Sequence, residues 1–223
     1  MGHGLFWYGD AMNIDIFADI ACPWCWIGIR RLDRALALRP HISVPRRWRP
    51  YQLQPGLPPE GIAFASFIEA KFGGRERARA MFQRVAQEGE SEGITFNFDN
   101  IAKANLTEDA HRLVLLADAQ GRAWEMAERL FQGYFQEGRD LNASSDLTEL
   151  AVAAGMDAAE AERLVQGRQY AEEVARSQQQ ASAEGVTGVP FYVFNGRFGL
   201  SGAQPLDTLL HLIDRFAPGG DLA

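Results

Sequence analysis

The chain has 223 residues, 47% of them hydrophobic, which is enough for one large or two small domains with a proper core. Its formal net charge is -7, from 22 basic and 29 acidic residues, and no basic run is dense enough to follow a phosphate backbone. The densest basic stretch, Arg46-Arg47-Trp48-Arg49, is interpreted as a strand and its rim. No segment approaches the roughly 18 uninterrupted apolar residues that a membrane span requires. These features predict a globular protein with no nucleic-acid partner and no membrane partner.

Residues 1–11 precede the first predicted strand. They contain neither the basic n-region nor the long apolar segment of a secretory signal. We interpret them as an N-terminal extension, and we expect a cytoplasmic protein unless a leader has been removed.

The first half of the chain begins with a predicted strand, helix and strand. Residues from Asn13 to Ile20 alternate and are rich in Ile and Phe, which is typical of a strand. A helix is predicted from about Pro23 to Leu38, and Pro40 ends it. The apolar residues at helical spacing are Cys25, Ile29, Leu32 and Leu36. His41 to Trp48 then predicts a second strand, parallel to the first because a helix separates them.

The only two cysteines form one motif, Cys22-Pro23-Trp24-Cys25. A disulfide across two intervening residues closes a very small loop, so structural stapling is a poor explanation. Zinc usually takes four ligands, and no histidine has finger-like spacing to these thiols. Two inert thiols at a strand end are a further alternative. The position beside a strand-helix unit favours dithiol redox chemistry. The thiols follow the carboxyl end of the first predicted strand, which is where open α/β sheets place their ligands.

The predicted helix gives the two thiols different roles. Cys22 lies at its first turn, where unpaired N–H groups and the positive end of the helix dipole favour a thiolate. We therefore expect Cys22 to be the nucleophile. Cys25 lies on the apolar stripe and is expected to be the shielded resolving thiol. Pro23 suits the first helical position, where its missing N–H would have no partner.

Between residues 61 and 185 the pattern changes to a series of helices that end at glycines. The predicted helices are Ala63–Phe72, Arg75–Glu88, Thr107–Ala119, Arg122–Glu137, Leu147–Ala154, Ala158–Gln166 and Gln169–Ala183. Two pairs have capping-box spacing, Asp146 with Glu149 and Asp157 with Glu160. The predicted helix stops are Gly121, Gly138, Gly155 and Gly185.

The apolar residues early in this helical block are interpreted as its core rather than as a cofactor site. They are Phe64, Phe67, Ile68 and Phe72. We expect the block to be an inserted helical domain.

The chain ends with two predicted strands and a helix. The strands are Phe191–Asn195 and Arg197–Ser201, with Asn195-Gly196 between them as a type I′ hairpin signal. The last helix runs from Pro205 to about Phe216. The predicted organisation is a discontinuous α/β domain of residues 12–58 and 186–217, interrupted by a helical domain of residues 61–185.

With these residues in place, the chain resembles the thioredoxin superfamily and, within it, the DsbA-like proteins of the FrnE type. The segments that carry the resemblance are Asp19–Gly28, which contains the thiol motif, Ala110-His111-Arg112-Leu113, Gly185–Phe191 and Ser201–Gln204. The resemblance implies a thioredoxin fold with a large inserted all-helical domain and protein-disulfide oxidoreductase activity. It also implies a cis Val189–Pro190 bond that faces Cys22, which leaves the backbone of Val189 free to pair with an extended peptide.

Two residues depart from the common pattern of thioredoxin-like proteins. Ile16 stands where a buried acid commonly helps to move the proton of the resolving thiol. Asp19 is the nearest acidic substitute, and a capping or turn role for it is an equal alternative. Trp24 stands where strongly oxidising members have histidine, so we expect a less oxidising redox poise.

The predicted substrate-binding residues are Pro23, Trp24, Val189, Pro190 and His111. The resemblance places the helix of His111 over the active-site groove, and a packed or capping role is its alternative. Trp26 could either join a substrate-facing rim or be buried between sheet and insertion. We expect no metal and no tightly bound cofactor. The expected partners are a disulfide-containing peptide or protein, or glutathione as a co-substrate, and a homodimer is one oligomeric state that the sequence allows.

A second class of enzyme shares this predicted architecture. Glutathione-dependent isomerases and transferases of the kappa type, such as 2-hydroxychromene-2-carboxylate isomerase, usually have serine at the nucleophile position. Two cysteines favour dithiol exchange, and a non-enzymatic redox sensor is the third hypothesis.

Overall fold

The computed structural model describes residues 12–217, so the interpretation of residues 1–11 as an extension lies outside the described residues. The strands of the main sheet are β1 Ile14–Ala18, β2 Arg46–Pro50, β5 Phe191–Phe194 and β6 Phe198–Ser201. A second, two-stranded sheet consists of β3 Ile62–Ala63 and β4 Lys103–Ala104. Sequence analysis missed this small ladder because each strand has only two residues.

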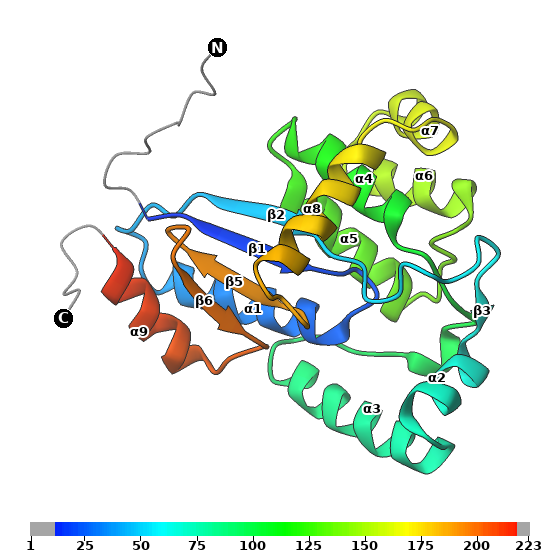
Figure 1. Cartoon of the computed structure of the whole chain (residues 1–223), viewed down its shortest axis with the longest axis horizontal. Coiled ribbons are helices and arrows are strands. Elements are labelled where there is room, and N and C mark those ends of the chain that lie inside the picture. Colours follow the sequence, from blue (N-terminus) through cyan, green and yellow to red (C-terminus); the bar gives the residue numbers. More distant parts are fainter. Residues whose placement is uncertain (1–11, 218–223) are drawn as a thin grey trace.

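Helices account for most of the chain between the two halves of the main sheet (Figure 1). They are α1 Pro23–Ala37, α2 Phe64–Phe72, α3 Arg75–Glu90, α4 Glu108–Asp118, α5 Ala123–Phe135, α6 Ser144–Ala153, α7 Ala158–Gln166, α8 Ala171–Ala183, α9 Leu206–Phe216 and the short 3-10 helix η1 Phe98–Asn100. This arrangement confirms the predicted α/β thioredoxin-like fold. The boundaries of the discontinuous domain and of the insertion stay a prediction about folding units.

The main sheet has the strand order β2-β1-β5-β6. β1 pairs in parallel with β2 on one side and antiparallel with β5 on the other, so Ile16 lies between Trp48 and Tyr192. β5 and β6 form an antiparallel hairpin. Its turn residues Asn195 and Gly196 both have positive φ, 52° and 66°, as a type I′ turn requires.

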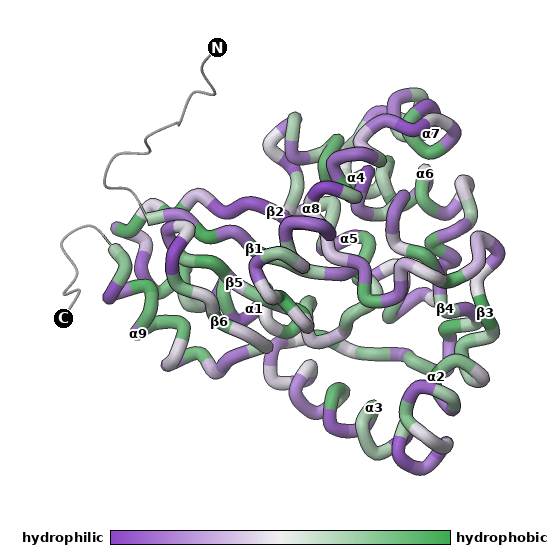
Figure 2. The backbone as a smooth tube through the Cα atoms, in the orientation of Figure 1, coloured by the Kyte–Doolittle hydropathy of each residue, from purple (hydrophilic) through white to green (hydrophobic). Residues whose placement is uncertain are grey.

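Alternate residues of β1 face the two sides of the sheet. Ile14 and Ile16 are fully buried in the large core that also contains α1 and α9. Phe17 points the other way and packs against Ala181 of α8 and Val186. Figure 1 shows α1 and α9 together on one side of the sheet, with α8 beside β2. In Figure 2 β1 and β5 at the centre of this sheet are largely hydrophobic, whereas β2 at its edge is largely hydrophilic.

The structure changes one predicted strand boundary and confirms one predicted helix cap. The second strand begins at Arg46 instead of His41, because a turn joins Ile42 N–H to Arg39 O and Pro45 has no N–H to donate. Asp157 caps α7 as predicted, by accepting from Glu160 N–H at 2.9 Å.

The predicted cap at Asp146 is wrong. Helix α6 begins at Ser144, three residues before the predicted start at Leu147, and the Asp146 carboxylate accepts instead from Asp140 N–H at 2.8 Å.

Trp26 joins α1 to the inserted helices. Trp26 is only 1% exposed, and its ring stacks on Phe131 with centroids 5.8 Å apart. It is also in a T-shaped arrangement with Phe96, with ring centroids 5.5 Å apart. The indole N–H donates to Glu128 Oε2 of α5 at 2.8 Å. Of the two alternatives for Trp26, the structure selects burial between sheet and insertion. The core is consequently continuous from the sheet into the helical block.

No helix within residues 12–217 combines the length and the apolar character that crossing a membrane would require.

Candidate functional site

The two thiols lie at the N-terminus of α1. Cys22 is the N-cap residue and Pro23 follows as the first helical residue. The backbone turns sharply before the helix, because Cys22 N–H donates to Asp19 O at 3.1 Å. Both cysteines are free thiols; Cys22 is 5% exposed and Cys25 is 0% exposed. The predicted difference in access is thus present, although Cys22 is itself largely enclosed.

The loop before β5 faces the thiol of Cys22. The Cys22 Sγ atom lies 3.5 Å from the carbonyl oxygen of Val189, in thiol-to-carbonyl hydrogen-bond geometry. The Val189–Pro190 peptide bond is cis. Among the described residues, the N–H of Val189 has no backbone hydrogen-bond partner. An extended substrate could therefore pair with this backbone beside the sulfur.

The environment of Cys25 keeps its sulfur protonated. Burial raises the pKa of the Cys25 thiol well above its ordinary value, and the hydrogen bond and the charge of Cys22 raise it further. The thiolate is the reactive form of a cysteine, so Cys25 is not expected to react while both cysteines are free thiols. We expect Cys25 to attack only after Cys22 has formed a mixed disulfide with the substrate.

We expect brief treatment of the native, reduced protein with iodoacetamide to modify Cys22 and leave Cys25 unmodified at mildly alkaline pH. Peptide mapping by mass spectrometry gives the two extents of modification. Repeating the experiment in denaturant, where burial is lost, should equalise them. Equal rates in the native protein would contradict the assignment of nucleophile and resolving thiol.

Asp19 holds the turn that carries Cys22. Its Oδ1 accepts from Ala21 N–H at 3.2 Å and its Oδ2 accepts from Leu53 N–H at 2.7 Å. The side chain is 1% exposed. The turn role that sequence analysis considered for Asp19 is therefore present, and a role in moving the proton of Cys25 stays a prediction.

His111 lies behind this turn, and its two ring nitrogens face different partners. The indole N–H of Trp48 donates to Nδ1 at 3.2 Å, so Nδ1 must be unprotonated. Nε2 then carries the proton, 3.2 Å from Tyr51 O and 3.5 Å from Asp19 Oδ1. His111 is 0% exposed. The prediction that it contacts substrate is corrected: the structure places it in the core, where it supports the turn.

Tyr192 and Gly28 belong to the site and were missed by sequence analysis. A Cβ atom on Gly28 of α1 would lie 2.3 Å from the Tyr192 hydroxyl oxygen and 3.0 Å from Pro190 Cγ, so only glycine fits here. Tyr192 is fully buried, and its hydroxyl has no hydrogen-bond partner within the described residues. Burial raises its pKa, and the charges of Cys25 and Cys22 add to that effect. No local pattern marks either residue, because their contact joins α1 to β5.

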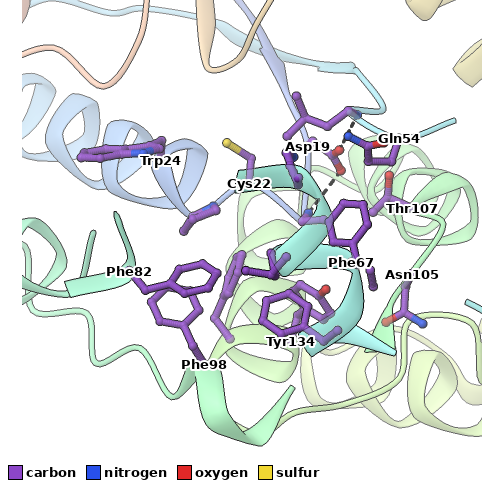
Figure 3. A pocket seen from close by; sticks show the side chains of 18 of the residues that line it. Asp19, Cys22, Trp24, Gln54, Phe67, Phe82, Phe98, Asn105, Thr107 and Tyr134 are labelled. Atoms are coloured by element: carbon purple, nitrogen blue, oxygen red, sulfur yellow. Dashed lines mark hydrogen bonds between the residues drawn. The ribbon is translucent and has the colours of Figure 1, made fainter. Parts of the chain in front are cut away.

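A cavity of about 230 Å³ opens beside Cys22, between the start of α1 and the inserted helices. Figure 3 shows Phe67, Phe82, Phe98 and Tyr134 below Cys22 in this view, with Trp24 to its left. The lining residues include Pro23, Trp24, Leu53, Leu57, Phe64, Phe67, Ile68, Phe72, Met81, Phe82, Phe98, Tyr134 and Phe135. Phe64, Phe67 and Phe72 are only partly buried. Ile68 is a buried core residue and Phe64 packs against the core, as predicted, but all four of these apolar residues also line this cavity.

Of the predicted substrate-binding residues, the structure brings four to the surroundings of Cys22. Pro23 and Trp24 line the cavity, and Val189 and Pro190 lie on the opposite loop. Within residues 12–217 no cluster of three or more His, Cys, Asp or Glu side chains could hold a metal ion.

Comparison with known proteins agrees with this geometry. Residues 13–214 match the family model of the DSBA-like thioredoxin domain. A probable DsbA oxidoreductase from Streptomyces coelicolor is 33% identical, with a TM-score of 0.86 over 92% of this chain and 89% of that chain.

Two more distant structures share the fold. The cytosolic disulfide reductase DsbM from Pseudomonas aeruginosa, also solved with GSH, is 22% identical, with a TM-score of 0.64 over 90% of this chain and 96% of that chain. A 2-hydroxychromene-2-carboxylate isomerase is 16% identical, with a TM-score of 0.62 over 90% of this chain and 92% of that chain.

Proposed function

The chain belongs to the family of DSBA-like thioredoxin domains, and from this premise we propose that it is a thiol-disulfide oxidoreductase that works as a disulfide reductase or isomerase. The observation that carries the proposal is the position of the two thiols. Cys22 borders a cavity and lies beside Val189, whose N–H has no backbone hydrogen-bond partner among the described residues, and Cys25 lies fully buried one helical turn behind Cys22. The finer assignment to the FrnE type is supported by the thiol motif and by the Gly-Val-Pro segment that ends at Pro190.

The proposed reaction has two exchange steps. Cys22, at the N-terminus of α1, attacks as the thiolate one sulfur of a substrate disulfide and releases the other as a thiolate. Cys25 then attacks the sulfur of Cys22, which releases the second product thiol and forms the Cys22–Cys25 disulfide. Burial holds Cys25 protonated until that step, so its proton must leave as the attack proceeds. Asp19, behind the thiol turn, is the acidic group that we propose for receiving it.

Several features favour reduction over net oxidation. Trp24 contributes no positive charge between the thiols, so the reduced form gains only the helix-end stabilisation. Two glutathione molecules could regenerate the dithiol, and the related reductase DsbM has been solved with GSH. That reductase is described as cytosolic, which supports a cytoplasmic site of action for this protein as well. The backbone N–H of Val189, together with Pro190, Pro23 and Trp24, would hold a disulfide-containing peptide or glutathione.

A glutathione-dependent isomerase or transferase is the second candidate. The specific observation in its favour is the shared fold of 2-hydroxychromene-2-carboxylate isomerase. Such an enzyme has no use for a second thiol. The buried Cys25 directly behind Cys22 therefore favours dithiol exchange.

Replacing the resolving thiol separates the two candidates. We expect the wild-type protein to catalyse reduction of insulin by dithiothreitol, and we expect Cys25→Ser to lose this turnover because the second exchange step is removed. Turbidity of the released insulin chain gives the rate. Glutathione-dependent isomerase or transferase turnover that survives Cys25→Ser, in a protein that never reduces insulin, would support the second candidate instead.

A further inference from the structure

The cavity beside Cys22 offers little to a charged ligand. Its lining residues with ionisable side chains are Asp19, Cys22, Lys71 and Tyr134. Both oxygens of Asp19 already accept backbone N–H groups, and the Tyr134 hydroxyl donates to Lys103 O at 3.1 Å. Lys71 is an exposed side chain whose ammonium lies 5.4 Å from the ring centroid of Phe67. The remaining wall is mainly aromatic and aliphatic.

The aromatic walls of the cavity form a connected group that the protein itself leaves uncovered. Phe82 stacks on Phe98 with centroids 4.3 Å apart, and Phe64 lies 5.9 Å from Phe82. All three are only partly buried, whereas the neighbouring Phe135 is 2% exposed. Uncovered aromatic surface beside a reactive group is typical of a site that receives an apolar ligand.

The volume of the cavity limits what can enter. An apolar cavity of roughly 150 Å³ holds benzene, whereas drug-sized ligands occupy pockets of roughly 300–1,000 Å³. A cavity of about 230 Å³ therefore suits one aromatic ring with a short linker. Because Cys22 lies on its wall, a ring held there while exchange takes place would be attached to the sulfur that Cys22 attacks.

We propose that the preferred substrates are disulfides in which one sulfur carries an aromatic or similarly bulky apolar group, and that this cavity holds the group while Cys22 attacks. This inference deepens the proposed reductase function and depends on it. Val189 lies outside the cavity lining and remains available for the other half of the substrate.

The reaction balances with glutathione as the reductant. Cys22 forms a bond to the sulfur that bears the apolar group, and the partner sulfur leaves as a thiolate. Cys25 then displaces the apolar thiol from Cys22. The substrate disulfide gains two electrons and two protons to become two thiols, and the protein dithiol loses them to become a disulfide. Two glutathione molecules return the protein to the dithiol and become glutathione disulfide.

The test compares benzyl 2-hydroxyethyl disulfide with bis(2-hydroxyethyl) disulfide as substrates of the full-length protein. Rates are followed through the formation of glutathione disulfide, and each is divided by the uncatalysed rate with glutathione alone to remove intrinsic reactivity. We expect kcat/KM to favour the benzyl compound by at least about tenfold. Full burial of a phenylalanine-sized group is worth more than the about 1.4 kcal/mol that corresponds to a tenfold change.

A trapping experiment identifies which half of the benzyl compound occupies the cavity. When Cys25→Ser reacts with the benzyl compound in the absence of glutathione, no thiol is present to resolve the mixed disulfide on Cys22, so the mass of the adduct reports which sulfur was attacked. We expect the benzylthio adduct. A predominant hydroxyethylthio adduct would overturn the proposal, because the apolar group would then lie outside the cavity.

Two tryptophan substitutions provide the matched structural comparison. Met81→Trp introduces a large side chain at a half-buried position on the cavity wall, so the ratio of the two kcat/KM values should fall toward one. Val152→Trp adds the same side chain to an exposed position, 47% accessible, on α6, and should retain the preference.

The outcomes separate the two levels of the account. Reduction of bis(2-hydroxyethyl) disulfide without a preference for the benzyl compound, or a preference that survives Met81→Trp, would overturn the cavity proposal and leave the reductase function intact. Failure to reduce either compound would overturn the cavity proposal, and it would overturn the reductase function as well if the protein also fails to catalyse insulin reduction by dithiothreitol.

Discussion

Replacement of Cys22 by serine is expected to abolish disulfide reductase activity, with a loss of at least about 10³-fold in rate. Cys22 is the thiol that borders both the cavity and the backbone of Val189, so no other sulfur can begin the exchange. Serine is nearly the same size, and Cys22 caps α1 without a side-chain hydrogen bond, so the fold should be retained. Insulin reduction by dithiothreitol gives the rate, and circular dichroism checks the fold.

The matched substitution, Cys25→Ser, should give a different kind of defect. Cys22 can still attack, so a mixed disulfide with the substrate should accumulate and be visible by mass spectrometry under non-reducing conditions. Activity that persists in Cys22→Ser, or mixed disulfides that form through Cys25 instead, would contradict the order of the two steps.

Trp26→Ala is expected to reduce the free energy of unfolding by about 3–5 kcal/mol, the usual cost of removing a buried tryptophan. The side chain fills the junction between α1 and the insertion, where it contacts Phe131 and Phe96. The change would also remove the donor to Glu128, which retains its ion pair with Arg30. Denaturation by urea, followed by far-ultraviolet circular dichroism, gives the difference.

Trp24→Ala is the control for this measurement. Trp24 lies two residues earlier on the same helix but is only half-buried at the edge of the cavity, with the guanidinium of Arg84 5.9 Å from its ring centroid. We expect its loss to cost under about 1.5 kcal/mol. Equal destabilisation by the two substitutions would contradict the separation of a structural tryptophan from a site tryptophan.

The features predicted correctly are those encoded by nearby residues. Asp157 and Glu160 are three positions apart, so the helix cap they form is visible in the sequence, and Asn195-Gly196 likewise encodes its own turn. Asp146 and Glu149 have the same spacing as the first pair. In the folded protein, however, Asp146 binds the backbone of Asp140, and this tertiary contact outweighs the local signal.

The features of the candidate site also fall into two groups, those encoded by nearby residues and those that depend on tertiary contacts. The motif of Cys22 and Cys25 could be recognised from the sequence because it lies at the start of a predicted helix. Pro190 could be recognised because it directly precedes a predicted strand. The contact of Tyr192 with Gly28 joins residues far apart in the chain and has no local pattern.

The cavity could not be predicted for a related physical reason. An apolar stripe such as Phe64, Ile68 and Phe72 has the same spacing whether it packs against protein or lines an empty volume. The two cases differ only in what lies opposite. His111 is the opposite case, a polar residue that was predicted to contact substrate and is instead fully buried. It lies between Trp48 and the turn held by Asp19.

The central claim is that Cys22 and Cys25 form a reversible redox pair, and equilibration of the protein with mixtures of reduced and oxidised glutathione tests it most directly. Rapid acid quenching, alkylation and mass measurement give the fractions of dithiol, internal disulfide and glutathione adduct. The account predicts a single transition between dithiol and Cys22–Cys25 disulfide, with a potential of roughly -150 to -250 mV, between those of thioredoxin and DsbA. A protein that shows only a glutathione adduct on Cys22, and no internal disulfide at any ratio, would contradict it.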